Sequence, residues 1–275
     1  MSSGYQYSGS LPGGYVPKNE AKQPVRVHNH WMMLHDFKCD KWISPLLAAG
    51  KLFEPFETEW MQNLVRPGDT VLDIGGHIGF YTLLLARLVG PIGKVLSFEP
   101  DPVNFALLQQ NVVLNGYTNV SLYNFALSNR PGTTTLFLSG DNAGDHRIWQ
   151  PAEARPGVQV QTVVLDQYLE AAQPRIHFIK MDIQGAEAAA LDGMKTLLGR
   201  QPQVTLITEF WPFGMRGFGA SAEDYLRLLT DLQFRVYLID EGHGRLIRVQ
   251  PDQLLQIFDP NQDVFGNLLC LKNPC

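Results

Sequence analysis

The stretch Val71–Leu88, which reads VLDIGGHIGFYTLLLARL, decides the fold. Residues 70–74 are short, apolar and rich in β-branched side chains, which is typical of a buried strand. After Gly79, apolar residues recur at helical intervals as far as Leu88, and Gly90 follows as a stop signal. The glycines therefore occupy a strand-to-helix turn, where the backbone can approach a ligand that a side chain would push away.

Strands and helices alternate from about residue 66 to the end of the chain. This alternation predicts an α/β fold, with a mostly parallel seven-stranded sheet and helices on both faces. The expected strands are residues 70–74, 94–100, 119–127, 176–182, 203–210, 234–240 and 263–272, and the expected helices are residues 80–89, 102–116, 186–199 and 221–233.

The composition divides the chain into three parts. Residues 1–25 are rich in Gly, Ser and Pro, which predicts a flexible N-terminal segment. Residues 26–66 carry apolar side chains at helical intervals and are expected to form a mainly helical extension. Residues 67–275 are expected to form the α/β domain, with a hairpin or lid inserted at about residues 132–163.

Charge and hydrophobicity exclude several classes of partner. The 275 residues carry a net charge of −5 and contain no block of Lys and Arg, so we expect no nucleic-acid partner. The three cysteines are too few and too scattered for a disulfide framework. We recognise no signal peptide, and no apolar run approaches the roughly 20 residues that span a bilayer. A cytoplasmic protein without a membrane span is therefore the expectation.

An acidic residue lies at the end of four predicted strands, at Asp73, Glu99, Asp182 and Glu209. Open sheets of this kind bind ligands beyond the carboxyl ends of their strands, so these acids are candidate site residues. Glu99 follows Gly79 by twenty residues, which is about the spacing at which a carboxylate accepts hydrogen bonds from the hydroxyls of a nucleotide ribose.

Two kinds of nucleotide cofactor fit this pattern. A dinucleotide fingerprint requires G-x-G-x-x-G, whereas the glycines here are Gly75, Gly76 and Gly79. A carboxylate at Asp73 would repel a pyrophosphate and attract a cationic group, which favours a nucleoside that carries an ammonium and a sulfonium. An NAD-type oxidoreductase remains the alternative.

Four motifs resemble those of a known family. They are VLDIGGHIGFYTL, FEPDPVNFALLQQNVVLN, ALSN and IKMDIQGAEAAALDG, and they span roughly residues 66–210. In order and spacing they are similar to the FkbM-type methyltransferases, which are class I enzymes that use S-adenosyl-L-methionine and release S-adenosyl-L-homocysteine. The resemblance implies methyl transfer, most often to a hydroxyl oxygen of a small metabolite, sugar, glycan or lipid.

The resemblance also implies roles for individual residues. The loop around the methionine part of the cofactor would be formed by Asp73, Gly75, Gly76, His77 and Gly79, and Glu99 would hold the ribose. Asp182 would face the methyl group or its acceptor. The residues expected near the adenine are Pro100, Asp101, Asn104, Phe125 and Ala126.

Two positions depart from the family pattern. Gly76 and His77 stand where the family usually has Ala-Asn. Gln184 stands where the family usually has the first glutamate of Asp-Val-Glu-Gly-x-Glu, a motif that occupies residues 182–187 here. This loss of charge leaves open a non-catalytic module that keeps the fold and the cofactor.

Methyl transfer to an alcohol requires a group that removes the hydroxyl proton. The candidate bases are Asp182, Glu209 and His146, and Lys180 could assist if it is buried and neutral. The loop that holds His146 also carries Arg147 and Trp149, and it could form a lid or an acceptor site. No His, Cys and carboxylate set has the spacing of a metal site, so no metal is expected.

Overall fold

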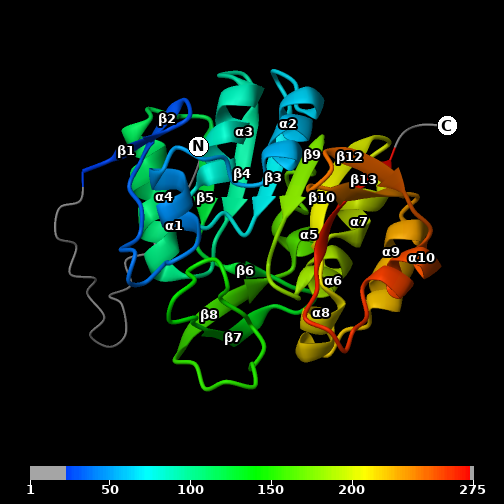
Figure 1. Cartoon of the computed structure of the whole chain (residues 1–275). Helices are drawn as coiled ribbons and strands as arrows, with labels where there is room; N and C mark the ends of the chain where they lie inside the picture. The colour runs from blue at the N-terminus through cyan, green and yellow to red at the C-terminus, as the bar shows by residue number, and fades with distance from the viewer. Residues whose placement is uncertain (1–22, 273–275) are drawn as a thin grey trace.

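The structure, a computed structural model, describes residues 23–272 and is built around one large sheet (Figure 1). Residues 1–22, which make up most of the predicted flexible segment, lie outside the described residues. In spatial order the sheet contains β12 (Arg245–Arg248), β11 (Arg235–Asp240), β13 (Gly266–Lys272), β10 (Val204–Phe210), β9 (Phe178–Met181), β3 (Thr70–Ile74), β4 (Lys94–Phe98) and β5 (Val120–Tyr123).

The pairing of these strands confirms the predicted α/β fold. Strands β5, β4, β3, β9 and β10 are parallel to their neighbours in the series, and β13 is antiparallel to both β10 and β11. Seven strands correspond to the seven that the sequence predicts. The eighth, β12, was not predicted and forms an antiparallel hairpin with β11 at the edge.

Helices cover both faces of the large sheet, as expected. One face carries α5 (Leu165–Tyr168), α6 (Glu187–Asp192), α7 (Lys195–Gly199), α9 (Ala222–Asp231) and α10 (Pro251–Ile257), and the other carries α2 (Pro55–Leu64), α3 (Phe80–Val89) and α4 (Pro102–Leu114). A further helix, α8 (Pro212–Phe218), follows β10. Within residues 23–272, no helix is long and apolar enough to cross a membrane.

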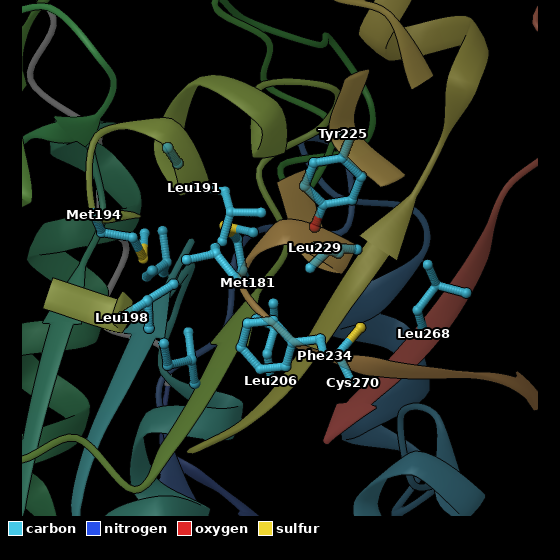
Figure 2. Packing of buried hydrophobic residues seen from close by; sticks show 14 of the residues in the cluster. Met181, Leu191, Met194, Leu198, Leu206, Tyr225, Leu229, Phe234, Leu268 and Cys270 are labelled. Atoms are coloured by element: carbon cyan, nitrogen blue, oxygen red, sulfur yellow. The ribbon is translucent and has the colours of Figure 1, made fainter. Parts of the chain in front are cut away.

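The larger core lies between the sheet and the α6–α9 layer (Figure 2). Leu206 of β10 and Leu268 and Cys270 of β13 pack against side chains of α6 and α9. The buried Tyr225 of α9 satisfies its hydroxyl with Thr208 Oγ1 at 2.8 Å, so this layer contains a large aromatic ring without an orphaned polar group.

A second, three-stranded sheet lies beyond the carboxyl ends of the central strands (Figure 1). Its order is β6 (Ala126–Leu127), β8 (Gly157–Val163) and β7 (Gly132–Phe137), and β7 and β8 form the hairpin that was expected within residues 132–163.

Two predicted elements are divided in the structure. Residues 119–127 form β5 and β6 in different sheets, because Asn124 between them bonds through Nδ2 to the carbonyl oxygens of Glu99 and Pro100, at 2.8 and 3.1 Å. The predicted helix 186–199 is split into α6 and α7 at Gly193, where a Cβ atom would collide with the backbone of Ser128.

The prediction of a mainly helical segment 26–66 is wrong for its first part. Strands β1 (Val25–Val27) and β2 (His30–Met32) form an antiparallel hairpin, followed by α1 (Ile43–Ala48) and α2. Burial alternates along β2, where His30 and Met32 face inward and Trp31 faces outward, so the period is two residues and not that of a helix.

The large core makes a direct stability prediction. Leu206 is fully buried at the centre of β10, so Leu206→Ala should lower the free energy of unfolding by about 2–5 kcal/mol. Val113→Ala on α4, where the side chain is 78% exposed, should change it by less than about 0.5 kcal/mol. Urea denaturation of both variants is the measurement, and equal effects would contradict the assignment of this core.

Candidate active site

The glycine turn joins β3 to α3 and packs against the end of β9. Gly75 and Gly79 have φ angles of 89° and 98°, in the left-handed region that favours glycine. The amides of Gly75 and Gly76 both donate to the carbonyl oxygen of Phe98, at 2.9 and 3.0 Å. A Cβ atom on Gly75 would overlap the carbonyl oxygen of Asp182, so the missing side chain is what brings these two segments together.

Asp73 lies beneath this turn and does not line the pocket. Its side chain is 1% exposed and accepts a hydrogen bond from Thr82 Oγ1, which also lies 3.0 Å from Ser97 Oγ. Burial raises the pKa of Asp73 to about 6, against the opposing effects of the Thr82 hydrogen bond and the charge of Lys180. The structure therefore gives Asp73 the role of joining the turn to α3, and its contact with a cationic ligand stays a prediction.

Glu99 lines the pocket at the end of β4. Its Oε2 accepts from the His77 amide and its Oε1 from the Asp101 amide, both at 2.8 Å. Burial and the charge of Asp101 raise the pKa of Glu99 to about 8, although the two backbone hydrogen bonds act in the opposite direction. The turn and the loop after β4 are thus held at fixed positions by one carboxylate.

The pocket beside Glu99 contains most of the predicted cofactor residues. Gly75, His77, Glu99, Pro100, Asn104, Phe125, Ala126 and Asp182 all line it. The other predicted residues support it from behind. Gly76 leaves room for Ser97, Gly79 packs on Leu108, and Asp101 caps α4 by accepting from the Asn104 amide at 2.8 Å.

Three histidines lie at one end of this pocket. The rings of His35 and His77 are 5.7 Å apart, and His35 Nε2 lies 2.6 Å from Asn104 Oδ1. His77 Nε2 is buried and has no hydrogen-bond partner among the described residues. Burial lowers the pKa of His77 to about 3 and that of His146 to about 4, so both rings are neutral at pH 7.

The carboxylates after β9 and β10 are bridged by Gln184. Its Nε2 donates to Asp182 Oδ1 at 2.9 Å and lies 3.4 Å from both carboxylate oxygens of Glu209. Burial and the charges of Asp182 and Glu187 raise the pKa of Glu209 well above its ordinary value. Glu209 therefore holds its proton more tightly than an ordinary glutamate, whereas the side chain of Asp182 is 26% exposed and is the accessible carboxylate.

Lys180 lies under these acids, with its side chain 1% exposed. Its Nζ is 2.9 Å from Glu57 Oε1, 3.8 Å from Asp182 Oδ2 and 3.9 Å from Glu54 Oε2. Burial alone would lower the pKa of Lys180, but these carboxylates outweigh it and raise the pKa above its ordinary value. Lys180 is therefore buried but charged, and it does not meet the condition, buried and neutral, under which it could assist the base.

His146 does not join this group of acids. It lies at the histidine end of the pocket, where its Nδ1 accepts from the Ser139 amide at 3.1 Å and His35 is the neighbour that most lowers its pKa. The structure thus brings Asp182, Lys180 and Glu209 together and separates His146 from them. Within residues 23–272, no three His, Cys, Asp or Glu side chains are grouped so as to hold a metal ion.

The acids of α2 were not identified from the sequence. Glu54 accepts from Tyr81 Oη and Asn267 Nδ2, both at 2.7 Å, and Glu57 is completely buried beside Lys180. A signal for Glu57 does exist, because it lies four residues from both Phe53 and Met61 and so falls on the apolar face of a helix.

Comparison with known proteins identifies the family. The family model described as Methyltransferase FkbM domain matches residues 73–236, which is more than half of the chain, and the protein therefore belongs to the FkbM methyltransferase family. Methyltransferase sdnD of Sordaria araneosa is 25% identical over 177 residues, covering 53% of this chain and 68% of that protein. The 31-O-demethyl-FK506 methyltransferase FkbM of Streptomyces tacrolimicus is 49% identical over 49 residues, 18% of each protein.

Among solved structures, an rRNA methylase from Streptococcus thermophilus covers 80% of this chain and 95% of its own, with 14% identity and a TM-score of 0.45. The family assignment confirms the resemblance seen in the motifs. The protein is an S-adenosyl-L-methionine-dependent methyltransferase, and the NAD-type alternative is not supported.

The buried ion pair predicts a large effect from an isosteric change. Glu57→Gln leaves Lys180 without its nearest carboxylate and should lower the free energy of unfolding by about 3 kcal/mol. Glu59→Gln, on the exposed side of the same helix, should change it by less than about 0.5 kcal/mol. Burial and the charge of Glu54 raise the pKa of Glu57 to about 8, so chemical denaturation at pH 9, where this carboxyl is ionised, measures both variants. A Glu57→Gln effect as small as that of the control would contradict the ion pair.

Glu187 makes a pH-dependent prediction. Burial raises its pKa from 4.5 to about 7, so its proton is bound more tightly in the folded state, and stability is lost as the pH rises from 4.5 through 7. Glu187→Gln removes this titration. Relative to wild type, the variant should gain about 1–3 kcal/mol in unfolding free energy between pH 4.5 and about pH 8. A difference that does not change with pH would show that Glu187 is ionised throughout.

Proposed function

We propose that the protein transfers the methyl group of S-adenosyl-L-methionine to a hydroxyl oxygen of a small metabolite, sugar or glycan. The observation that carries this proposal is the position of Asp182. It is the accessible carboxylate of a buried acid cluster, and its backbone is in direct contact with the glycine turn of the cofactor pocket.

The residues of the pocket fit the cofactor. Glu99 presents carboxylate oxygens that suit ribose hydroxyls, and the unpartnered Nε2 of His77 is a buried polar atom that a ligand can satisfy. Gly75 lines the part of the pocket that suits the methionine end of the cofactor, while Phe125 and Ala126 offer an apolar wall for the adenine. When bound, the cofactor supplies an electrophilic methyl group on a sulfonium.

The catalytic role of the chain is to hold the acceptor hydroxyl and take its proton. Asp182 is the group we assign as the base, because Lys180 carries its own proton and Glu209 is more deeply buried than Asp182. Gln184 holds the side chains of Asp182 and Glu209 in one arrangement. Fixing the hydroxyl in line with the methyl group supplies much of the remaining rate enhancement.

We also propose that residues 67–275 form one catalytic domain and that residues 26–66 are an extension that completes it. The hairpin and α1 of the extension pack against α3 and α4, and α2 supplies Glu57 to Lys180. The absence of a nucleic-acid partner and the cytoplasmic location stay predictions from the sequence.

Substitution of the two acids separates their roles. With a hydroxyl acceptor found by screening with methyl-labelled cofactor, Asp182→Asn should lower kcat by about 10²–10⁴-fold, because the base is lost. Glu209→Gln should lower it by about tenfold or less, since the amide keeps the size of the side chain and the base Asp182 is retained. Both variants should bind S-adenosyl-L-homocysteine as wild type does, which calorimetry measures.

Undiminished turnover in Asp182→Asn would contradict the assignment of the base. Cofactor binding without transfer to any hydroxyl acceptor would instead favour the non-catalytic module.

A further inference from the structure

Arg147 lies between two tryptophan rings near the end of β10. Its guanidinium carbon is 4.9 Å from the ring centroid of Trp149 and 4.6 Å from that of Trp211. The two rings are themselves 6.0 Å apart, and the arginine side chain is only 12% exposed. Stacking against indole faces is a favourable environment for a guanidinium, so the group is held in one position.

The two tryptophans are fixed by their own contacts. Trp149 Nε1 donates to the carbonyl oxygen of Gln184 at 2.9 Å, and Trp211 Nε1 donates to Asp263 Oδ1 at 2.9 Å. Helix α8 accommodates both rings because Gly214 and Gly217 have no side chains, and a Cβ atom at either glycine would collide with an indole. Both indole rings are therefore held in fixed positions by hydrogen bonds and by close packing on α8.

The hydrogen-bonding capacity of Arg147 is only partly used. Its Nε donates to Asp145 Oδ1 at 2.6 Å. Asp145 is shared with Arg155, whose Nη2 lies 2.8 Å from Oδ2. No acceptor within residues 23–272 is bonded to Nη1 or Nη2 of Arg147, and neither atom is among the fully buried unpartnered ones, so up to four N–H donors of this cation are open to a ligand.

The position of this guanidinium relates it to the acceptor and not to the cofactor. His146 and Ile148 line the cofactor pocket, whereas Arg147 and Trp149 do not line it and pack together with Trp211. Trp149 is bonded to Gln184, which bridges the catalytic acids, and Trp211 follows Glu209 by two residues.

We infer that Arg147, held between Trp149 and Trp211, binds an oxyanion group, a carboxylate or a phosphate, on the methyl acceptor. The inference rests on the proposed function, because it assigns a specificity residue to the acceptor side of the same site. The planar fork of a guanidinium matches the paired oxygens of a carboxylate or phosphate, and the indole edges offer apolar cover for the attached ring or chain.

Sugar probes of different charge test this site without requiring turnover. With S-adenosyl-L-homocysteine bound, tryptophan fluorescence would follow titrations of D-glucuronate, D-glucose 6-phosphate and D-glucose at constant ionic strength. At least one charged sugar should bind wild type about 10- to 100-fold more tightly than glucose. Tighter binding of D-glucuronate indicates an acceptor with a carboxylate, and tighter binding of D-glucose 6-phosphate indicates an acceptor with a phosphate.

Variants at two arginines assign the effect. Arg147→Met should bring the charged sugars to the affinity of glucose, and Arg147→Lys should retain only part of the preference, because it keeps the charge and loses the fork. Arg216→Met is the matched control, since Arg216 is an exposed cation of α8 that stacks on Phe213 outside the two indoles. Thermal unfolding and S-adenosyl-L-homocysteine affinity show whether each variant is folded. If Arg147→Met is unfolded, the result for Arg147→Lys tests the inference in its place.

Two results would overturn the inference. The first is that wild type binds charged and neutral sugars with equal affinity, or binds none of them. The second is that a folded Arg147 variant keeps the wild-type preference for the charged sugars. Methyl transfer to hydroxyl acceptors is measured separately. Its absence in a wild type that does prefer anions would overturn the proposed function and leave the anion site standing.

Discussion

The buried charge of Lys180 is the constraint on which the rest of the site depends. An ammonium in the interior of a sheet costs several kcal/mol of desolvation unless a carboxylate lies within ion-pair distance. Glu57 of α2 fulfils this requirement at 2.9 Å, which obliges the N-terminal extension to pack on the sheet. Asp182 follows Lys180 by two residues, and its partly exposed side chain lies beside the glycine turn. One ion pair thus links the extension, the sheet and the acceptor side of the pocket.

The same region contains more acids than Lys180 can neutralise. Burial and mutual repulsion raise the pKa of Glu187 to about 7 and that of Glu209 well above its ordinary value, so both acids lose their protons at a higher pH than exposed carboxyls do. Gln184 fits this balance. An amide donates to both Asp182 and Glu209, whereas a glutamate in its place would add a further acid within a few ångströms and could not donate to either. The departure from the family pattern therefore keeps the acid cluster together without a second cation beside Lys180.

Local patterns predicted the parts of the site that depend on neighbouring residues. The strand, the glycine turn, the helix and Glu99 could be read because their roles follow from spacing along the chain. Glu57 meets Lys180 only through packing between distant segments, and no spacing reveals that contact. The sequence also does not show whether a strand-end acid points into the pocket, and this is why Asp73 was assigned to the cofactor although it lies beneath the turn.

The protonation state of Lys180 tests the account most directly. Nitrogen-15 NMR of lysine-labelled protein, with Lys180→Arg to assign the signal, reports the Nζ charge as a function of pH. The account predicts that this nitrogen stays protonated up to at least its ordinary pKa of 10.5. A Lys180 that loses its proton near pH 7 would contradict the ion pair with Glu57 and would return lysine to the candidates for the base.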